Sequence, residues 1–259
     1  MAQQYPYEEW DPVLLRDQTT IQLLVVGVIF VVCLFFWKRF KEKQKDEIKL
    51  LAITISALDL AFIIATIHML MAVNENHNDI INGIPIFWGT GHIWWTNLSY
   101  IFVSIASMCI LRFIQLLFKK PPQKTYTFVL IANIGINLWS LYHGSVIVVP
   151  GIPSLTLPMS IIWLLITVYV WGMLFVYSYH DYTRLEPSIF KVGLGLISVS
   201  AFCMIISYAL YAVYSVFKMQ ELGKIYYIFY IFTALLIYVG YILPQWLRRL
   251  LSKKYPETN

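Results

Sequence analysis

Seven apolar blocks of about twenty residues each run through the chain, and they limit what it can fold into. A helix of that length spans the ~30 Å hydrocarbon core of a bilayer. The blocks show no strand-like alternation, and only helices or closed barrels satisfy their own backbone in lipid. With 59% hydrophobic and 13% charged residues, the chain is not an ordinary soluble domain. We expect an all-α polytopic membrane protein, a seven-transmembrane helix bundle.

Charge, proline or glycine marks the limits of each block. The predicted spans are Ile21–Trp37, Leu50–Val73, Thr96–Phe118, Tyr126–Val149, Leu157–Tyr179, Phe190–Phe217 and Ile225–Leu243. Residues 1–20 are expected to lie outside the membrane, residues 21–250 to form the transmembrane domain, and residues 251–259 to form a cytoplasmic tail. The first span is expected to stay as an anchor, because basic residues follow it instead of a small-residue cleavage site.

The basic residues are divided unequally between the two sides of the predicted bundle. Sixteen of the nineteen lie at the inner ends: Lys38, Arg39, Lys41, Lys43, Lys45, Lys49, Arg112, Lys119, Lys120, Lys124, Arg184, Lys191, Arg248, Arg249, Lys253 and Lys254. The other side holds Arg16, Lys218 and Lys224. The positive-inside rule then predicts an N-terminus outside and a cytoplasmic C-terminus in the cell membrane. This asymmetry accounts for the net charge of +5 without a nucleic-acid partner. The expected partner is the lipid bilayer.

The second predicted span carries a carboxylate, Asp59, about ten residues from its inner end and therefore roughly 15 Å deep. Asn133 and Asn137 of the fourth span lie at a similar depth, and the third span contributes Ser104. Two interpretations stay open. The side chains form packing hydrogen bonds worth ~0.6–2 kcal/mol each, or Asp59 is the centre of a site that senses protons or cations.

Two histidines, His68 and His143, lie at similar depth near the outer ends of the second and fourth spans. This placement permits haem ligation, or a metal site completed by His77 or His92. Neither assignment is specific, because the chain lacks a repeated helical pattern of histidines. We therefore predict no cofactor and no bound metal, and count both histidines among the candidate ligand-binding residues.

Tyrosines are concentrated in the outer halves of the last two predicted spans: Tyr208 and Tyr211 in one, Tyr227 and Tyr230 in the other. An aromatic belt accounts for rings at the membrane surface. Deeper phenols need hydrogen-bond partners and should face protein or a water-lined cavity. The four tyrosines therefore indicate either a pocket for a small amphipathic or aromatic ligand, open to the outside, or internal packing.

A seam of small residues follows the sixth span at helical spacing: Gly193, Ser200, Cys203 and Ser207. Such seams let another helix approach closely. The partner is either a neighbouring helix of the same chain or a second copy in a homodimer.

Catalytic motifs are absent from the sequence, which has no HExxH, no GxSxG and no paired-carboxylate element. No catalytic residue is assigned and no enzymatic activity is predicted. A retinal protein is excluded because the last span has no lysine for a Schiff base. A secondary transporter predicts internal repeats and helices broken by Pro or Gly, which are not seen. Transport of a small molecule or ion nevertheless stays the alternative function.

The segment Tyr238–Lys254, YVGYILPQWLRRLLSKK, resembles the exit of the seven-helix sensory modules at the N-terminus of many prokaryotic signalling histidine kinases. In that family an aromatic-Gly pair, a proline and Trp-Leu-Arg-Arg lead into a juxtamembrane helix. The resemblance implies an integral membrane sensor or receptor-like protein that detects a small ligand, proton or cation from the outer side. The 259 residues contain no kinase segment, so we expect a separate cytoplasmic signalling partner.

Overall fold

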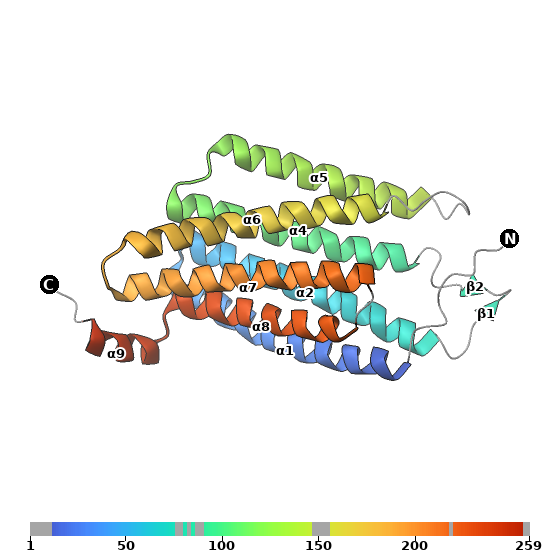
Figure 1. Ribbon diagram of the computed structural model, residues 1–259, viewed down its shortest axis with the longest axis horizontal. Coiled ribbons are helices and arrows are strands. Elements are labelled where there is room, and N and C mark those ends of the chain that lie inside the picture. Colours follow the sequence, from blue (N-terminus) through green and yellow to red (C-terminus); the bar gives the residue numbers. More distant parts are fainter. Residues whose placement is uncertain are drawn as a thin grey trace.

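The computed structural model is a bundle of long antiparallel helices (Figure 1). It describes residues 12–75, 80–81, 84–85, 91–146, 156–217 and 220–255. The helices are α1 (Pro12–Lys43), α2 (Asp46–Glu75), α4 (Gly91–Phe118), α5 (Gln123–Val146), α6 (Thr156–Arg184), α7 (Ile189–Phe217), α8 (Gln220–Ile242) and α9 (Gln245–Lys254). A two-residue antiparallel ladder joins β1 (Ile80–Ile81) to β2 (Ile84–Pro85). The predicted all-α architecture is confirmed.

Six helices are long and apolar enough to cross a membrane within the described part of the chain. The segments that qualify are Thr19–Lys43, Asp46–Ile67, Leu98–Phe118, Ile161–Arg184, Ile189–Val213 and Lys224–Ile242. They make the chain a multi-pass membrane protein with the lipid bilayer as its surroundings. The helix α5 has 24 residues and is not among the six. Its first turn is polar, and Asn133 and Asn137 interrupt its apolar sequence, so a seventh span stays a prediction.

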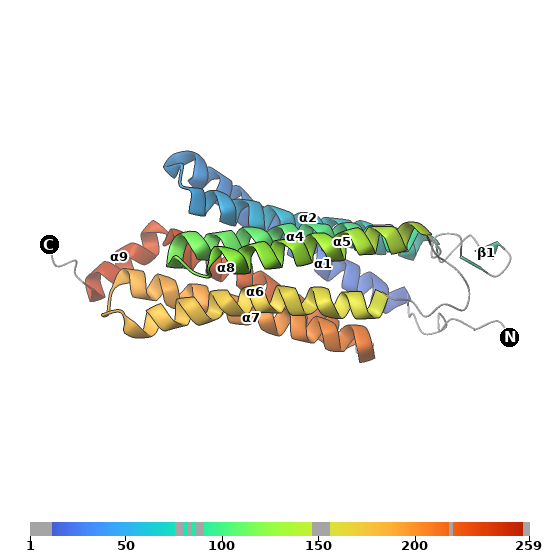
Figure 2. The same cartoon turned by 90° about the horizontal axis from the view of Figure 1, so that it is seen from above.

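The six candidate spans form a closed ring in the order α1, α2, α4, α6, α7, α8, and α8 returns to α1. The most extensive contact is between α7 and α8. The helix α5 lies outside the ring, at the margin of the bundle, and packs on α4 and α6 (Figures 1 and 2).

Left-handed residues end three of the helices at the same end of the bundle. Gln44, Lys119 and Leu243 have φ angles of 50°, 57° and 47° after α1, α4 and α8. Each N–H bonds back to the carbonyl four residues earlier, for example that of Gln44 to Phe40 at 2.7 Å. These bonds satisfy carbonyls that a helix end leaves free and turn the chain sharply.

The ends of the helices are sorted as the charge pattern predicts. The connections α1–α2, α4–α5 and α6–α7 and the helix α9 all lie at one end of the bundle (Figure 1). That end gathers the sixteen basic residues named above, whereas Arg16 and Lys224 begin helices at the other. We call it the basic end. The sequence predicts that the transmembrane domain ends at residue 250 and that a tail follows. In the structure, helix α9 runs from Gln245 to Lys254 across that boundary.

The small-residue seam of α7 is used within the chain. A Cβ atom added to Gly193 would lie 2.6 Å from the Gly240 carbonyl oxygen of α8, closer than any real contact. Ser200 Oγ donates to the Thr233 carbonyl at 2.8 Å, and Ser207 Oγ donates to a second α8 carbonyl at 3.0 Å. Cys203, the other member of the seam, is buried. Of the two predicted partners, the neighbouring helix α8 occupies this seam.

Candidate functional site

The middle of α2 is polar, but most of its polar side chains are satisfied within the helix. The hydroxyls of Thr54, Ser56 and Thr66 each donate to the carbonyl four residues earlier, at 2.8 Å. This back-bonding lets Ser and Thr sit in an apolar helix without a partner elsewhere. A carboxylate only accepts hydrogen bonds, and a helix interior has no free N–H to offer it. Asp59 is therefore the member of this stretch that depends on other helices.

Asp59 is buried, with 4% of its surface exposed, and its Oδ1 atom is fully enclosed. Among the described residues it accepts no hydrogen bond, and the ion pairs found there, Arg39–Glu42 and His180–Asp181, do not involve it. The titratable groups in electrostatic contact with it are the Cys33 thiol of α1 and the Tyr230 phenol of α8. Neither neighbour supplies a positive charge.

A small hydrogen-bonded group beside Asp59 fixes α2 against α1. Trp37 Nε1 donates to Ser56 Oγ at 2.9 Å, and Cys33 Sγ lies 2.9 Å from the same oxygen. Ser56 precedes Asp59 by three residues and therefore lies close to it along the helix. Movement of α1 relative to α2 would break these contacts, so Asp59 sits at a junction of defined geometry.

Aromatic side chains of α8 reach α2 across the interior of the ring. The Phe62 ring meets the Tyr230 ring edge to face with centroids 4.3 Å apart, and that of Tyr227 at 5.9 Å. Gln22 of α1 donates its Nε2–H to the Tyr227 hydroxyl. The helices α2 and α8 are not neighbours in the ring, so these contacts pass through its centre.

The aromatic contacts continue to α7 and α6. The Tyr208 phenol of α7 lies near Tyr230, although its hydroxyl makes no hydrogen bond of good geometry. Tyr208 meets Trp163 of α6 edge to face at 5.9 Å, and Trp163 lies 4.7 Å from the Tyr100 ring of α4. We call the connected buried set the polar-aromatic cluster: Gln22, Asp59, Phe62, Trp163, Tyr208, Tyr227 and Tyr230.

Four members of the polar-aromatic cluster keep a buried polar atom without a hydrogen-bond partner in the described part of the chain. The atoms are Gln22 Oε1, Asp59 Oδ1, Trp163 Nε1 and Tyr208 Oη. Buried polar atoms are nearly always hydrogen-bonded, and several unpaired ones in one interior are unusual. Two acceptors, a donor and a hydroxyl are thus available to a small polar species.

The asparagines of α5 form a separate polar contact with α4. Asn137 Nδ2 donates to Ser104 Oγ at 2.8 Å and to the Asn133 carbonyl at 2.7 Å. Asn133 Nδ2 donates to the Val129 carbonyl at 3.0 Å within its own helix, and to the Met108 Sδ atom of α4 at 3.6 Å. Interhelical hydrogen bonding is thus present between Asn137 and Ser104 and, to a sulfur acceptor, for Asn133. Its role is to attach α5 to the ring.

The structure divides the polar centre considered in the sequence into two places. Asp59 lies within electrostatic reach of Cys33 of α1 and Tyr230 of α8, whereas Asn133, Asn137 and Ser104 meet at the α4–α5 contact. No hydrogen bond joins Asp59 to either asparagine in the described residues. Equal depth in the membrane fixes the height of a residue, but not its direction around the bundle.

Three of the four candidate tyrosines, Tyr208, Tyr227 and Tyr230, belong to the polar-aromatic cluster. Tyr211 is half-buried and packs edge to face on Tyr226 at 5.5 Å. All four rings are thus in contact with other side chains, as internal packing predicts.

His68 and His143 lie on α2 and α5, but their side chains fall outside the described residues. The described part contains no group of three His, Cys, Asp or Glu side chains placed to hold a metal.

Sequence reasoning missed two members of the cluster, Gln22 and Trp163. Gln22 had a weak signal, because it is an amide within the first apolar block, although it is only the second residue of Ile21–Trp37. Trp163 had none, since it is one of nine tryptophans in a chain with 17% aromatic residues. The residues that complete the cluster were therefore only partly recognisable.

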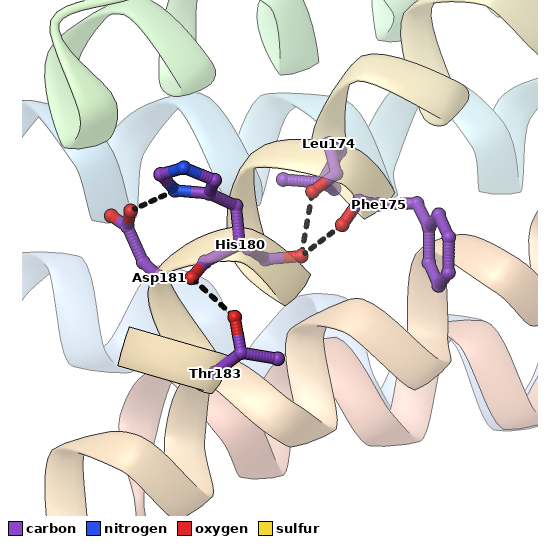
Figure 3. A network of polar contacts seen from close by, with 6 residues as sticks. Leu174, Phe175, His180, Asp181 and Thr183 are labelled. Carbon is purple, nitrogen blue, oxygen red and sulfur yellow. Dashed lines mark hydrogen bonds and ion pairs between the residues drawn. The ribbon is translucent and has the colours of Figure 1, made fainter. Parts of the chain in front are cut away.

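A second polar group lies on the last turns of α6 at the basic end (Figure 3). His180 Nδ1 lies 3.2 Å from Asp181 Oδ1, and Thr183 Oγ1 donates to the His180 carbonyl at 2.8 Å. Ser178 Oγ donates to the carbonyls of Leu174 and Phe175. Every contact is within one helix, and the His180 and Asp181 side chains are exposed. The group stabilises the end of α6 and gathers no other element.

Comparisons with protein-family models, with curated proteins and with solved structures find no match to this chain. Functional inference therefore rests on the chemistry of its residues. The polar-aromatic cluster offers an amide from α1, a carboxylate from α2 and buried phenols from α7 and α8. This set suits the binding of a proton or a small cation.

Proposed function

We propose that this protein is an integral membrane sensor in which Asp59 binds a proton or a small cation and thereby changes how α1 and α8 pack around α2. The carrying observation is the burial of Asp59 without a hydrogen bond or a positive neighbour in the described residues. An isolated carboxylate in apolar surroundings costs several kcal/mol. Uptake of a proton or a cation removes that cost, so the occupancy of Asp59 and the packing of its neighbours are coupled.

The surroundings of Asp59 support a switching role. A change of charge there acts on α1 through Cys33 and on α8 through Tyr230 at the same time. A signal needs two packings of the helices that a ligand stabilises to different degrees. The unpaired atoms of Gln22 and Tyr208 give the interior unused hydrogen-bonding capacity for a second arrangement.

The proposal includes the orientation in the membrane. The basic end faces the cytoplasm, and the N-terminus lies outside the cell membrane. The helix α5 crosses the membrane as the fourth span in chain order and brings the number of spans to seven. A separate cytoplasmic protein reads the state of the bundle at the basic end. The resemblance of Tyr238–Lys254 to the exit of sensory modules agrees with this arrangement.

The test is the thermal unfolding of purified wild type, Asp59→Asn and Thr66→Val in detergent, across pH and across Na⁺ and K⁺ concentrations. We expect the wild-type melting temperature to depend on one of these variables, because binding to the folded state stabilises it. Asp59→Asn should remove the dependence and fold at least as well, since it removes a buried charge. Thr66→Val, a matched change on α2 at a locally satisfied hydroxyl, should keep it. An unchanged dependence in Asp59→Asn would refute the proposal.

Transport of protons or cations is the second candidate function. It is favoured by the spread of unpaired polar atoms along the helices, because Gln22 and Tyr208 are nearer to those ends of α1 and α7 that lie away from the basic end, and Asp59 is near the middle of α2. Proteoliposomes that contain a pH-sensitive dye distinguish the two functions. A transporter gives flux that Asp59→Asn abolishes, whereas a sensor gives the binding-dependent stability without flux.

A further inference from the structure

The helix α9 is set apart from the bundle at the basic end (Figures 1 and 2). It begins at Gln245, directly after Leu243 in the left-handed region and Pro244. Arg248 Nε donates to the Leu243 carbonyl at 3.0 Å, and the Arg248 N–H donates to the Pro244 carbonyl at 3.0 Å. These bonds fix the bend between α8 and α9, so α9 leaves the membrane-spanning direction at a defined point.

One face of α9 is apolar and only partly covered by the bundle. Trp246 and Leu250, one helical turn apart, are 59% and 60% exposed, whereas Leu247 and Leu251 are half-buried. The sequence of α9, QWLRRLLSKK, is the most amphipathic of the described helices. Trp246 and Leu250 therefore form an exposed apolar edge next to the side that packs on the protein.

Positive charges lie beside this apolar edge. At 100° per residue, Arg249 and Lys253 lie within about 100° of both Trp246 and Leu250 around the helix. Both cations are exposed, and α9 contains no acidic residue. Apolar side chains with adjacent Lys and Arg are typical of helices that lie in the surface of an anionic membrane. The apolar groups enter the acyl region, and the cations contact lipid phosphates.

We propose that α9 is a membrane-surface helix that binds the anionic lipid headgroups around the basic end, with Trp246 and Leu250 inserted and Arg249 and Lys253 on the phosphates. Charge complementarity selects this occupant, because α9 carries four cations and no anion. Its position does so too, since only Leu243 and Pro244 separate α9 from the end of the last candidate membrane-spanning segment at Ile242. The inference rests on the fold and is independent of the proposed role of Asp59.

The test uses the full chain in nanodiscs of phosphatidylcholine alone or with phosphatidylglycerol. In a background variant, alanine replaces Cys33, Cys109 and Cys203. An environment-sensitive fluorophore is attached at Leu250→Cys. The matched control carries it at Ser252→Cys, on the opposite, exposed side of α9. We expect blue-shifted emission and quenching by nitroxide lipids at position 250, stronger in anionic discs, and neither effect at position 252.

Charge variants separate the lipid contact from simple apolar burial. Arg249→Gln and Lys253→Gln are each expected to lower the ratio of inserted to exposed fluorophore about fivefold in anionic discs, which corresponds to ~1 kcal/mol per cation. Lys120→Gln in the α4–α5 connection and Lys124→Gln in the first turn of α5 remove the same charge and should change the ratio little. Equal insertion of the fluorophore in both lipids would overturn the proposal. Blue-shifted emission without quenching would also overturn it, because the apolar edge would then be packed on protein.

A second measurement does not need the cysteine replacements. Hydrogen–deuterium exchange of the wild-type segment Gln245–Lys254 is expected to slow when phosphatidylglycerol is added to the discs. The peptide around Gln123–Lys124, also at the basic end, serves as the internal control. The same exchange rate for α9 in the two lipids would overturn the proposal.

Discussion

The helix pair α7–α8 and the single helix α5 show two different ways of holding a helix in this bundle. Between α7 and α8 the backbones touch, because Gly193 and Gly240 face each other and a Cβ atom on either would meet the other backbone at 2.6–2.8 Å. Hydroxyls of Ser200 and Ser207 then reach carbonyls of the partner helix. Close approach gives both van der Waals contact and interhelical hydrogen bonds.

The helix α5 shows no such seam over residues 123–139, whose side chains the structure describes. Its outer face is largely uncovered, with Phe128, Ile131 and Leu138 exposed to 72%, 64% and 61%. The glycine of α5 whose surroundings are described, Gly135, has no atom within 4 Å of where a Cβ would be. The described side-chain hydrogen bonds from α5 to the ring join Asn137 to Ser104 and, more weakly, Asn133 to Met108 Sδ. In lipid, apolar surface alone does not drive helices together, so the density of small residues decides how tightly each helix is held.

The largest expected effect comes from closing the α7–α8 approach. Gly240→Ala places a Cβ 2.8 Å from the Gly193 oxygen and from Leu196 Cβ, and backbone contacts cannot be relieved by a rotamer change. We expect the free energy of unfolding to fall by about 1–3 kcal/mol, measured by denaturant titration in mixed micelles. Gly135→Ala on α5 is the matched control and should be neutral or stabilising, because its surroundings are open. Equal losses for the two variants would remove the distinction between the helices.

The next effect concerns the attachment of α5. Asn137→Leu removes the hydrogen bond to Ser104 and is expected to destabilise the protein by about 1 kcal/mol. A double-mutant cycle with Ser104→Ala isolates the pair, and the coupling energy should account for most of that loss. Asn133→Leu provides the contrast, because the Asn133 amide bonds to the Val129 carbonyl and to Met108 Sδ, and not to Ser104, so it should couple weakly to Ser104. Zero coupling between Asn137 and Ser104 would show that α5 is held by packing alone.

A smaller effect is expected for the hydroxyls of the α7–α8 contact. Ser200→Ala removes one interhelical bond, while the Thr233 hydroxyl keeps its bond to the Phe229 carbonyl at 2.9 Å. The expected loss is about 0.6 kcal/mol, read from the same titration. A loss as large as that of Gly240→Ala would mean that hydrogen bonds, and not close approach, dominate this contact.

The smallest effect is expected on the outer face of α5. Leu138→Ala changes a side chain that is mostly exposed, and the stability should change by less than about 0.5 kcal/mol. Leu174→Ala on α6, which truncates a fully buried leucine, gives the contrast and should be clearly destabilising. A marked loss for Leu138→Ala would indicate that another helix or a second chain covers this face.

The sequence predicted the helices and the seam better than it predicted which residues meet. The apolar blocks are local features, so they located the helices, although α1 is longer at both ends than Ile21–Trp37. The spacing of Gly193, Ser200, Cys203 and Ser207 indicated close packing, but a spacing along one helix carries no information on its partner. Asp59 and Asn137 were placed together by depth, and the ring order separates them. The arrangement of helices around the bundle axis is set by contacts between distant residues.

The contact between Gln22 and Tyr227 has a consequence for biosynthesis. These residues are 205 positions apart, and they join the first described helix to α8. Chains emerge from the ribosome N-terminus first, so local pairs such as α1 with α2 form early, whereas the ring closes only after α8 has been inserted. Until then, the Gln22 side of α1 faces lipid or the insertion machinery. A chain that stalls before α8 therefore keeps the Gln22 amide without its Tyr227 partner.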